Sequence, residues 1–265
     1  MTWVGTADLA RRSGITVLAN CPFHPDARGM VSGMASGTTS GMAGIPHAAG
    51  ADAETTRALG WAKTQYYTAT SIDGYIADAD NSLEWLFDAD GGTENPFGGF
   101  FAGVGAFAMG ANTYEWVLRN DNVLAEPGNW HDLYGDAPCW VFTHRELPLV
   151  PDANILMVSG DVRRVHEAMI VAAKGRNVWL AGGGDLVGQF VDQGLLDEII
   201  LGIAPVLLGA GTPLLPRHLS ARQLALTGTA QIGRFAYLTY AVGSGPMPGR
   251  HPAAARSGVR EPAYG

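Results

Sequence analysis

The sequence predicts an α/β fold in which helices cover both faces of a central, mostly parallel sheet. Short apolar runs alternate with amphipathic segments between residues 65 and 204, a pattern typical of parallel strands linked by helices. Residues 224–229 and 235–242 flank a Gln-Ile-Gly-Arg turn and predict an antiparallel C-terminal edge. With 47% hydrophobic and 16% charged residues, the 265-residue chain has the composition of a globular protein with a core.

Each predicted element has a local signal. Strands are predicted where apolar or β-branched runs end in turn-forming residues, at 65–71, 105–109, 139–143, 155–158, 177–181 and 195–204. Helices are predicted at 83–87 and 114–118, from the N-cap Asp161 to Lys174 with Gly175 as the stop, and from Asp185 onward. Residues 91–99 predict a glycine-rich loop.

These elements place one domain at residues 64–242. Residues 1–63 are rich in Gly, Ala, Ser, Thr and Met without a sustained period, so we expect a flexible N-terminal extension with at most a short element at 9–18. Residues 243–265 are again rich in Gly, Pro and Ala and are expected to form a disordered tail.

Composition argues against several classes of function. A net charge of −8 disfavours a nucleic-acid or anionic-membrane partner. Cys21 and Cys139 are the two cysteines, too few for a disulfide framework or a cysteine metal cluster. The histidines at 131, 144 and 166 lack metal-ligand spacing, so no metal site is predicted. No apolar run has membrane-spanning length and no signal-peptide pattern is present, so we expect a cytoplasmic protein.

The candidate binding site lies where the predicted strands end. In open α/β sheets, ligands bind beyond the carboxyl ends of the strands. Those ends carry small residues, hydroxyls and one arginine beside a histidine: Asp73-Gly74, Gly110-Ala111-Asn112-Thr113, Thr143-His144-Arg145, Ser159-Gly160-Asp161 and Gly182-Gly183-Gly184. Helix starts offer free N–H groups and a positive dipole end, so this set suits a phosphate-bearing ligand. The alternative for the three glycines is a tight turn with close helix–sheet packing.

Several motifs in order carry a resemblance to a known family. They are TATSIDGYIA at 68–77, LEWL at 83–86, MGANTY at 109–114, VFTHR at 141–145, LAGGGDLVGQF at 180–190, Asp197-Glu198, and PVLLG at 205–209. Together they resemble the dihydrofolate reductase-like superfamily and, within it, the RibD C-terminal reductase domain of bacterial riboflavin biosynthesis. The resemblance implies an NADPH-dependent reductase that forms a homodimer. No zinc-deaminase signature precedes the domain, so the bifunctional riboflavin enzyme is not expected.

The resemblance also assigns roles by position. Ala69 and Ile76 would flank the nicotinamide-ribose, and Gly110, Asn112 and Thr113 would form the first phosphate-binding helix start. The adenosine 2′-phosphate would face Thr143, His144 and Arg145, with Ser159 at the neighbouring strand end. The pyrophosphate would be held by Gly182, Gly183 and Gly184 with the amides of Asp185 and Leu186, and the 182–183 peptide would be cis.

Two positions depart from the family pattern. Ala111 stands where family members often carry an arginine, so Arg145 would supply the charge for a 2′-phosphate nearly alone. Val187 stands where dihydrofolate reductase has an aromatic residue near the nicotinamide. The acidic residue of that enzyme's first half has no firm counterpart, although Asp90 is a candidate.

Few residues are candidates for the chemistry. Asp73 is the first candidate for substrate contact or proton supply, because its turn lies beside the expected nicotinamide; the alternative is that its carboxylate caps the turn. Trp85 is expected to wall the substrate cavity or to pack in the core. No Gly-x-Ser-x-Gly elbow surrounds Ser159, so hydrolase chemistry is not expected.

Two functions remain open from the sequence. The first is NADPH-dependent reduction of a small heterocyclic or carbonyl substrate that is pteridine- or pyrimidine-like. The second is a catalytically silent nucleotide-binding protein of the same fold, which the departures at Ala111 and Val187 would favour.

Overall fold

The computed structural model describes residues 62–89 and 96–243. Several predictions fall on residues outside the described ranges. These are the N-terminal extension at 1–63 apart from residues 62 and 63, its short element at 9–18, Asp90, and the tail at 243–265 apart from residue 243. Two sheets form within the described part of the chain, one large and one of two short strands.

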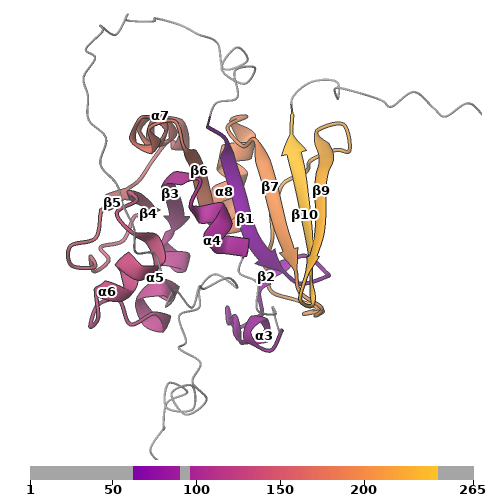
Figure 1. Cartoon of the computed structure of the whole chain (residues 1–265), viewed down its shortest axis with the longest axis horizontal. Coiled ribbons are helices and arrows are strands. Elements are labelled where there is room, and N and C mark those ends of the chain that lie inside the picture. Colours follow the sequence, from indigo (N-terminus) through magenta and orange to yellow (C-terminus); the bar gives the residue numbers. More distant parts are fainter. Residues whose placement is uncertain (1–61, 90–95, 244–265) are drawn as a thin grey trace, which may run out of the picture.

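The large sheet has eight strands in the order β5-β4-β3-β6-β1-β7-β10-β9 (Figure 1). Its strands are β1 (Thr64–Thr70), β3 (Val104–Gly110), β4 (Cys139–Phe142), β5 (Ile155–Val158), β6 (Asn177–Gly182), β7 (Glu198–Ile203), β9 (Leu224–Ile232) and β10 (Phe235–Val242). Every pair from β5 through β7 is parallel, whereas β10 runs antiparallel to both β7 and β9. The predicted fold class, including the antiparallel C-terminal edge, is therefore confirmed.

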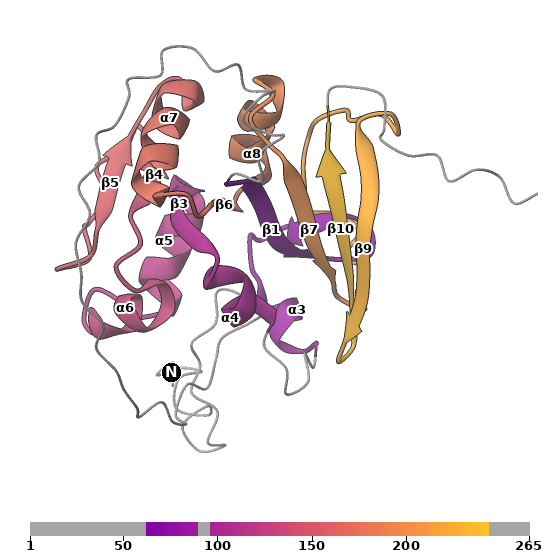
Figure 2. The same cartoon turned by 45° about the horizontal axis from the view of Figure 1, so that its top comes forward.

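Helices cover both faces of the sheet. They are α3 (Glu84–Phe87), α4 (Pro96–Phe101), α5 (Ala111–Asn120), α6 (Gly128–Tyr134), α7 (Val162–Ala173) and α8 (Gly184–Asp192). Side chains of α3 to α6 enter one hydrophobic cluster and side chains of α7 and α8 enter the other. In Figure 2, α7 and α8 lie at the top, and α3, α4 and α6 lie at the bottom.

Strand β1 illustrates how the two clusters share one sheet. Successive side chains of a strand point to opposite faces, so Tyr66 enters the α7/α8 cluster and Tyr67 enters the other. Both are buried, at 0% and 2% exposure. The buried Tyr66 hydroxyl donates to Leu214 O at 3.0 Å, and Trp179 Nε1 donates to Tyr67 O at 3.1 Å. These bonds satisfy polar groups that would otherwise destabilise the core.

Two local predictions were wrong, and one helix was not predicted. Helix α4 begins within the segment predicted as a glycine-rich loop, because Phe97, Phe100 and Phe101 all pack on Trp179 and this burial outweighs the low helix propensity of glycine. Helix α6 was not predicted; its Trp130 and Tyr134 rings pack against each other at a tilt, with centroids 4.7 Å apart, and belong to the same hydrophobic cluster. No helix connects β4 to β5, so strict alternation of strands and helices fails there.

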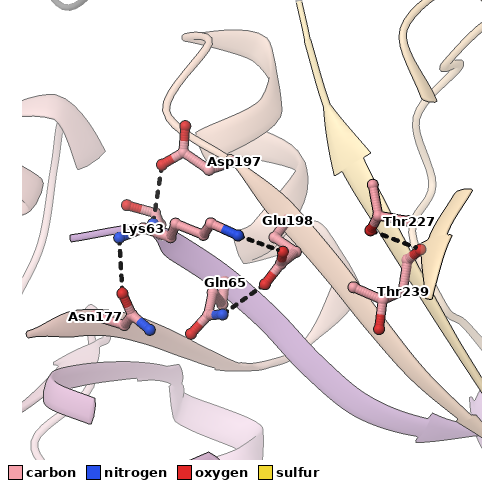
Figure 3. A network of polar contacts seen from close by, with 8 residues as sticks. Lys63, Gln65, Asn177, Asp197, Glu198, Thr227 and Thr239 are labelled. Carbon is pink, nitrogen blue, oxygen red and sulfur yellow. Dashed lines mark hydrogen bonds and ion pairs between the residues drawn. The ribbon is translucent and has the colours of Figure 1, made fainter. Parts of the chain in front are cut away.

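Polar contacts fix the amino ends of β1, β6 and β7 (Figure 3). Glu198 accepts from Lys63 Nζ at 2.7 Å and from Gln65 Nε2 at 2.6 Å. Asp197 accepts from Thr64 N at 2.9 Å, and Asn177 accepts from Lys63 N at 2.9 Å. The Asp197-Glu198 motif therefore fixes the register between β1 and β7 at the amino ends of these strands. The candidate site is expected at the opposite, carboxyl ends.

Candidate functional site

Two helices begin directly after neighbouring parallel strands, and a glycine precedes each. Gly110 caps α5 after β3, and Gly183 caps α8 after β6. Neither cap has a side chain that could hydrogen-bond the first-turn amides. Val187 N donates to Gly183 O at 3.2 Å, which is the first hydrogen bond of the α8 helix. The three amides before it, at residues 184–186, therefore have no acceptor within the helix. Both helix starts therefore present N–H groups at a positive dipole end, which suits phosphate groups.

The two glycine turns lie against each other. A Cβ placed on Gly110 would lie 3.7 Å from both Gly182 O and Gly183 N, and one on Gly182 would lie 3.8 Å from Thr113 Oγ1. Gly182 has a φ of +131°, which side-chain-bearing residues rarely adopt, and its peptide bond to Gly183 is cis, as the resemblance implies. The structure thus brings together the two turns predicted to bind phosphate, Gly110 and Gly182, which lie far apart in the sequence.

Gly184 differs from the other two glycines in what surrounds it. A Cβ on Gly184 would lie 2.7 Å from Pro213 O and closer still to Leu214 O. This position therefore matches the alternative interpretation, in which glycine allows a helix to pack closely on a strand. By contrast, the nearest atom to a Cβ on Gly183 is Ile76 Cδ1 at 3.9 Å, so this position faces the side chain expected beside the nicotinamide-ribose.

The segment that contains Ile76 is held in place by a second small sheet. Strand β2 (Tyr75–Ala77) pairs antiparallel with β8 (Thr212–Pro213), and Leu214 N donates to Gly74 O at 2.9 Å. Figure 1 places β2 and α3 beyond the arrowhead of β1. Ala69, also expected near the nicotinamide-ribose, is 6% exposed near the end of β1 and belongs to the hydrophobic cluster on the side of α3 to α6.

Arg145 reaches the first turn of α5. Its Nη2 donates to Asn112 Oδ1 at 2.9 Å, and its Nη1 donates to Glu115 Oε1 at 2.9 Å. The sequence predicted the first partner as part of the same site but missed Glu115, which lies three residues after Asn112 on the same helical face. Glu115 partly neutralises the guanidinium, so a 2′-phosphate would meet a carboxylate beside the arginine.

The other predicted residues of the 2′-phosphate region lie on exposed loops. Thr143 Oγ1 accepts from Arg145 N at 2.9 Å and stabilises the turn after β4. His144 is exposed in that turn, and Ser159 is exposed directly after β5. Asp161, the predicted N-cap of α7, accepts from Gln193 Nε2 at 2.7 Å and from Arg163 N at 3.0 Å. These two bonds lower the pKa of the Asp161 carboxyl, the Gln193 bond most strongly.

The start of α8 carries one charge pair that sequence reasoning missed. Asp185 is exposed, and its Oδ1 lies 3.5 Å from Arg217 Nη1. Arg217 also donates from Nε to Asp192 Oδ2 at 2.8 Å, and it lies over Gly188, where a Cβ would approach its Cζ to 2.8 Å. Leu186 is buried in the core, so the predicted contact with a ligand is limited to its amide.

Asp73, the first candidate for substrate contact or proton supply, is exposed in the turn after β1. Its carboxylate accepts from Ser71 Oγ at 2.6 Å, from Leu208 N at 3.1 Å and from Gly209 N at 2.7 Å. The Ser71 bond, followed by the two backbone amides, lowers the pKa of Asp73 to about 2, so the carboxylate is ionised at neutral pH. The carboxylate joins the turn after β1 to the loop that contains Leu208 and Gly209. Its bond to Ser71 also fits the alternative that Asp73 caps its own turn.

Trp85 packs toward the core. Its ring joins the cluster formed by α3 to α6, as the core alternative for this residue predicts. Its Nε1 is nevertheless buried without a hydrogen-bond partner among the described residues. In residues 62–89 and 96–243, no three His, Cys, Asp or Glu side chains are grouped to hold a metal ion, and no helix is long and apolar enough to cross a membrane.

Comparisons with known proteins match this architecture. Residues 62–236 match the family model of the RibD C-terminal domain. The chain is 34% identical over 178 residues to the Bacillus subtilis protein named uncharacterized protein YwjB, covering 67% of this chain and 97% of that protein.

Two solved structures share the fold. A Shewanella sp. PV-4 protein named for riboflavin biosynthesis superposes with a TM-score of 0.57 at 24% identity, covering 68% of this chain and 99% of that one. A Thermotoga maritima protein named as a diaminohydroxyphosphoribosylaminopyrimidine deaminase and 5-amino-6-(5-phosphoribosylamino)uracil reductase superposes with a TM-score of 0.51 at 15% identity, covering 72% of this chain and 59% of that one.

Proposed function

Because the chain belongs to the RibD C-terminal domain family, we propose that it is an NADPH-dependent reductase of a small heterocyclic or carbonyl compound. The observation that carries the proposal is the contact between the two glycine-capped helix starts, where Gly110 lies beside the Gly182–Gly183 peptide. Two adjacent helix starts, whose first-turn amides have no acceptor within their own helix, suit a dinucleotide better than a single phosphate.

The cofactor assignment follows the positions of the residues around these turns. The pyrophosphate would lie on the turn at 182–184 and the amides of Asp185 and Leu186, and the α5 start would be the second anion site. Arg145, with Thr143 and His144, would face the 2′-phosphate. Ile76 lies beside Gly183 and would contact the nicotinamide-ribose. When bound, NADPH supplies the hydride, and the protein contributes position and electrostatics.

The proton that completes the reduction comes from a source other than Asp73 in this proposal. An ionised carboxylate with a pKa of about 2 does not donate a proton at neutral pH. We assign the proton to water. Asp73 then acts as a positioning residue, because its bonds from Leu208 N and Gly209 N hold that loop beside Ile72, which itself donates to Val206 O.

A binding test distinguishes a specific effect on the glycine turn from a general effect on folding. Gly183→Val would place a branched side chain toward Ile76, where the nearest atom to the Cβ is 3.9 Å away, so the protein should fold but lose NADPH binding by at least about tenfold. Gly128→Val is the matched control, because a Cβ there meets nothing within 4 Å and the residue begins α6. NADPH binding, followed by cofactor fluorescence, that is equal in the two variants would refute the proposed turn.

The second candidate function is a nucleotide-binding protein that has lost catalysis. It is favoured by the Arg145–Glu115 pair, which weakens the site for a 2′-phosphate, and by the ionised state of Asp73. NADPH binding without oxidation across a panel of pterins, folates and aminouracils would support this function over reduction. The homodimer implied by the family is part of the first proposal, and sedimentation of the purified protein measures it.

A further inference from the structure

One arginine contacts both ends of the helix whose start is the proposed pyrophosphate site. Arg217 follows β8 in the chain, and its Nε donates to Asp192 Oδ2 at 2.8 Å at the end of α8. Its Nη1 lies 3.5 Å from Asp185 Oδ1 in the first turn of the same helix. Arg217 therefore joins two carboxylates that are about two turns of helix apart.

Two buried glycines allow this arginine and its segment to lie directly on α8. A Cβ on Gly188 would approach Arg217 Cζ to 2.8 Å and its Nε to 3.0 Å. One turn earlier, a Cβ on Gly184 would lie 2.7 Å from Pro213 O. Because residues four apart share a face of a helix, both glycines face the segment at 213–217. Arg217 is consequently held against the helix, with 27% of its side chain exposed.

Contacts that do not involve the Arg217 side chain fix the same segment to the sheet. Leu214 N donates to Gly74 O at 2.9 Å, and Leu214 O accepts from the Tyr66 hydroxyl at 3.0 Å. The pairing of β8 with β2 adds to these bonds. The segment therefore stays attached when the guanidinium is removed, so the charge of Arg217 can be tested apart from the fold.

Asp185 places a negative charge beside the amides that would bind the pyrophosphate. Its side chain is 76% exposed, and its own amide is one of the three without an acceptor within the helix. A phosphate oxygen lies about 2.9 Å from an amide nitrogen that binds it, so the carboxylate of the same residue would lie within roughly 7 Å of the phosphate. This distance is shorter than the screening length of about 8 Å in physiological salt. Repulsion would therefore weaken binding unless a positive charge offsets it.

From these contacts, we infer that Arg217 offsets the charge of Asp185 and thereby allows the start of α8 to bind the pyrophosphate of the dinucleotide. The inference rests on the proposed function, because it takes the pyrophosphate to lie on the amides of Asp185 and Leu186. Arg217 acts through its charge and its contact with Asp185, so it is a positioning residue. Arg145 would serve the 2′-phosphate and Arg217 the pyrophosphate, so the two arginines act on different parts of one cofactor.

Substitutions at two positions separate the charge of Arg217 from its packing. Arg217→Met removes the charge but keeps an unbranched side chain over Gly188. For two negative charges at about 9 Å in a dielectric constant of about 40, NADPH should bind about tenfold more weakly at 0.01 M salt and about threefold more weakly at 0.15 M salt. Adding Asp185→Asn should restore the affinity to within about threefold of the native value, because the two opposite charges are then removed together. If Arg217 only packs the segment against α8, Asp185→Asn leaves the loss in place, and this result would overturn the inference.

Matched variants control for net charge and for folding. Asp192→Asn in the Arg217→Met protein also removes one carboxylate that Arg217 binds, but about two turns farther from the helix start, so it should recover only about twofold. Recovery equal to that from Asp185→Asn would contradict the inference. Arg222→Met removes an exposed arginine just before β9, at the amino ends of β1 and β7, and should leave NADPH affinity within about twofold. Arg217→Lys keeps the charge and should bind NADPH like the native protein, which tests the inference even if Arg217→Met folds poorly.

Inorganic pyrophosphate repeats the comparison without the rest of the cofactor. Its binding is followed by NMR at the amides of Asp185 and Leu186 in the native protein and in the same variants. If pyrophosphate binds there with the expected dependence on Arg217 and Asp185 while NADPH does not bind, the inference holds and the proposed function fails. If NADPH binds to all variants with equal affinity at 0.01 M salt, the inference fails and the proposed function holds.

Discussion

Removing the charge of Glu115 should increase the preference of the site for NADPH over NADH. Glu115 Oε1 lies 2.9 Å from Arg145 Nη1, so a 2′-phosphate that shares this guanidinium would lie at roughly 6 Å from the carboxylate. At this separation, a dianion and a carboxylate in a dielectric constant of about 40 to 80 repel by about 1.4 to 2.8 kcal/mol, and physiological salt reduces this by about half. Glu115→Gln should therefore raise NADPH affinity by about 1 kcal/mol, or about fivefold, and leave NADH affinity nearly unchanged.

Arg145→Ala should instead lower the affinity for NADPH. A charge-assisted hydrogen bond contributes about 1.5 to 3 kcal/mol when desolvated, but the Arg145 side chain is 51% exposed and already paired, so we expect a loss near the lower limit. Fluorescence titrations with both cofactors at low and physiological salt measure these effects, with Glu167→Gln on α7 as the control for loss of one negative charge. Equal changes for NADPH and NADH in either variant would refute the role assigned to Arg145.

Two further predictions concern carboxylates, one held by hydrogen bonds and one buried. Asp73→Asn should leave NADPH binding within about twofold but accelerate hydrogen exchange at the amides of Leu208 and Gly209, which the carboxylate binds in the native protein. The pKa of Asp73 in the folded protein is lowered to about 2, so its contribution to the free energy of unfolding is present above about pH 4 and is lost as the pH falls toward 2. Urea titrations of the native protein and of Asp73→Asn across this pH range measure that contribution. Asp121 is the opposite case: burial raises its pKa to about 7, and neither carboxylate oxygen has a hydrogen-bond partner among the described residues. Its ionisation in the unfolded chain therefore lowers stability as pH rises from about 4 to 7, and Asp121→Asn should raise the melting temperature more at pH 8 than at pH 5; an equal effect at both would contradict the burial argument.

The sequence was sufficient to predict the strands of the large sheet and the strand ends at which the candidate site is expected. Parallel strands buried on both faces appear as short apolar runs, and the glycine and hydroxyl residues after them marked the turns at Gly110 and Gly182. The cis peptide at 182–183 and the N-cap at Asp161 were also predicted and are confirmed. These features depend on local chemistry or on an ordered set of motifs.

Features that depend on tertiary contacts were missed. Helix α4 forms although its sequence contains two glycines, because its phenylalanines are buried against Trp179, which is distant in sequence. The partners of Asp73 lie about 135 residues away, so no local pattern indicated that its carboxylate binds the amides of Leu208 and Gly209. Glu115 had a usable signal, its i, i+3 spacing from Asn112, but its pairing with Arg145 required the fold that brings the turn after β4 to α5.

The central claim is that the two glycine-capped helix starts together bind a reduced dinucleotide. A crystal structure of the protein soaked with NADPH tests it most directly. We predict that the pyrophosphate oxygens lie within hydrogen-bond distance of the amides of Asp185 and Leu186, with the nicotinamide-ribose against Ile76. A dinucleotide bound at the amino ends of the strands, or none bound at millimolar cofactor, would contradict the claim.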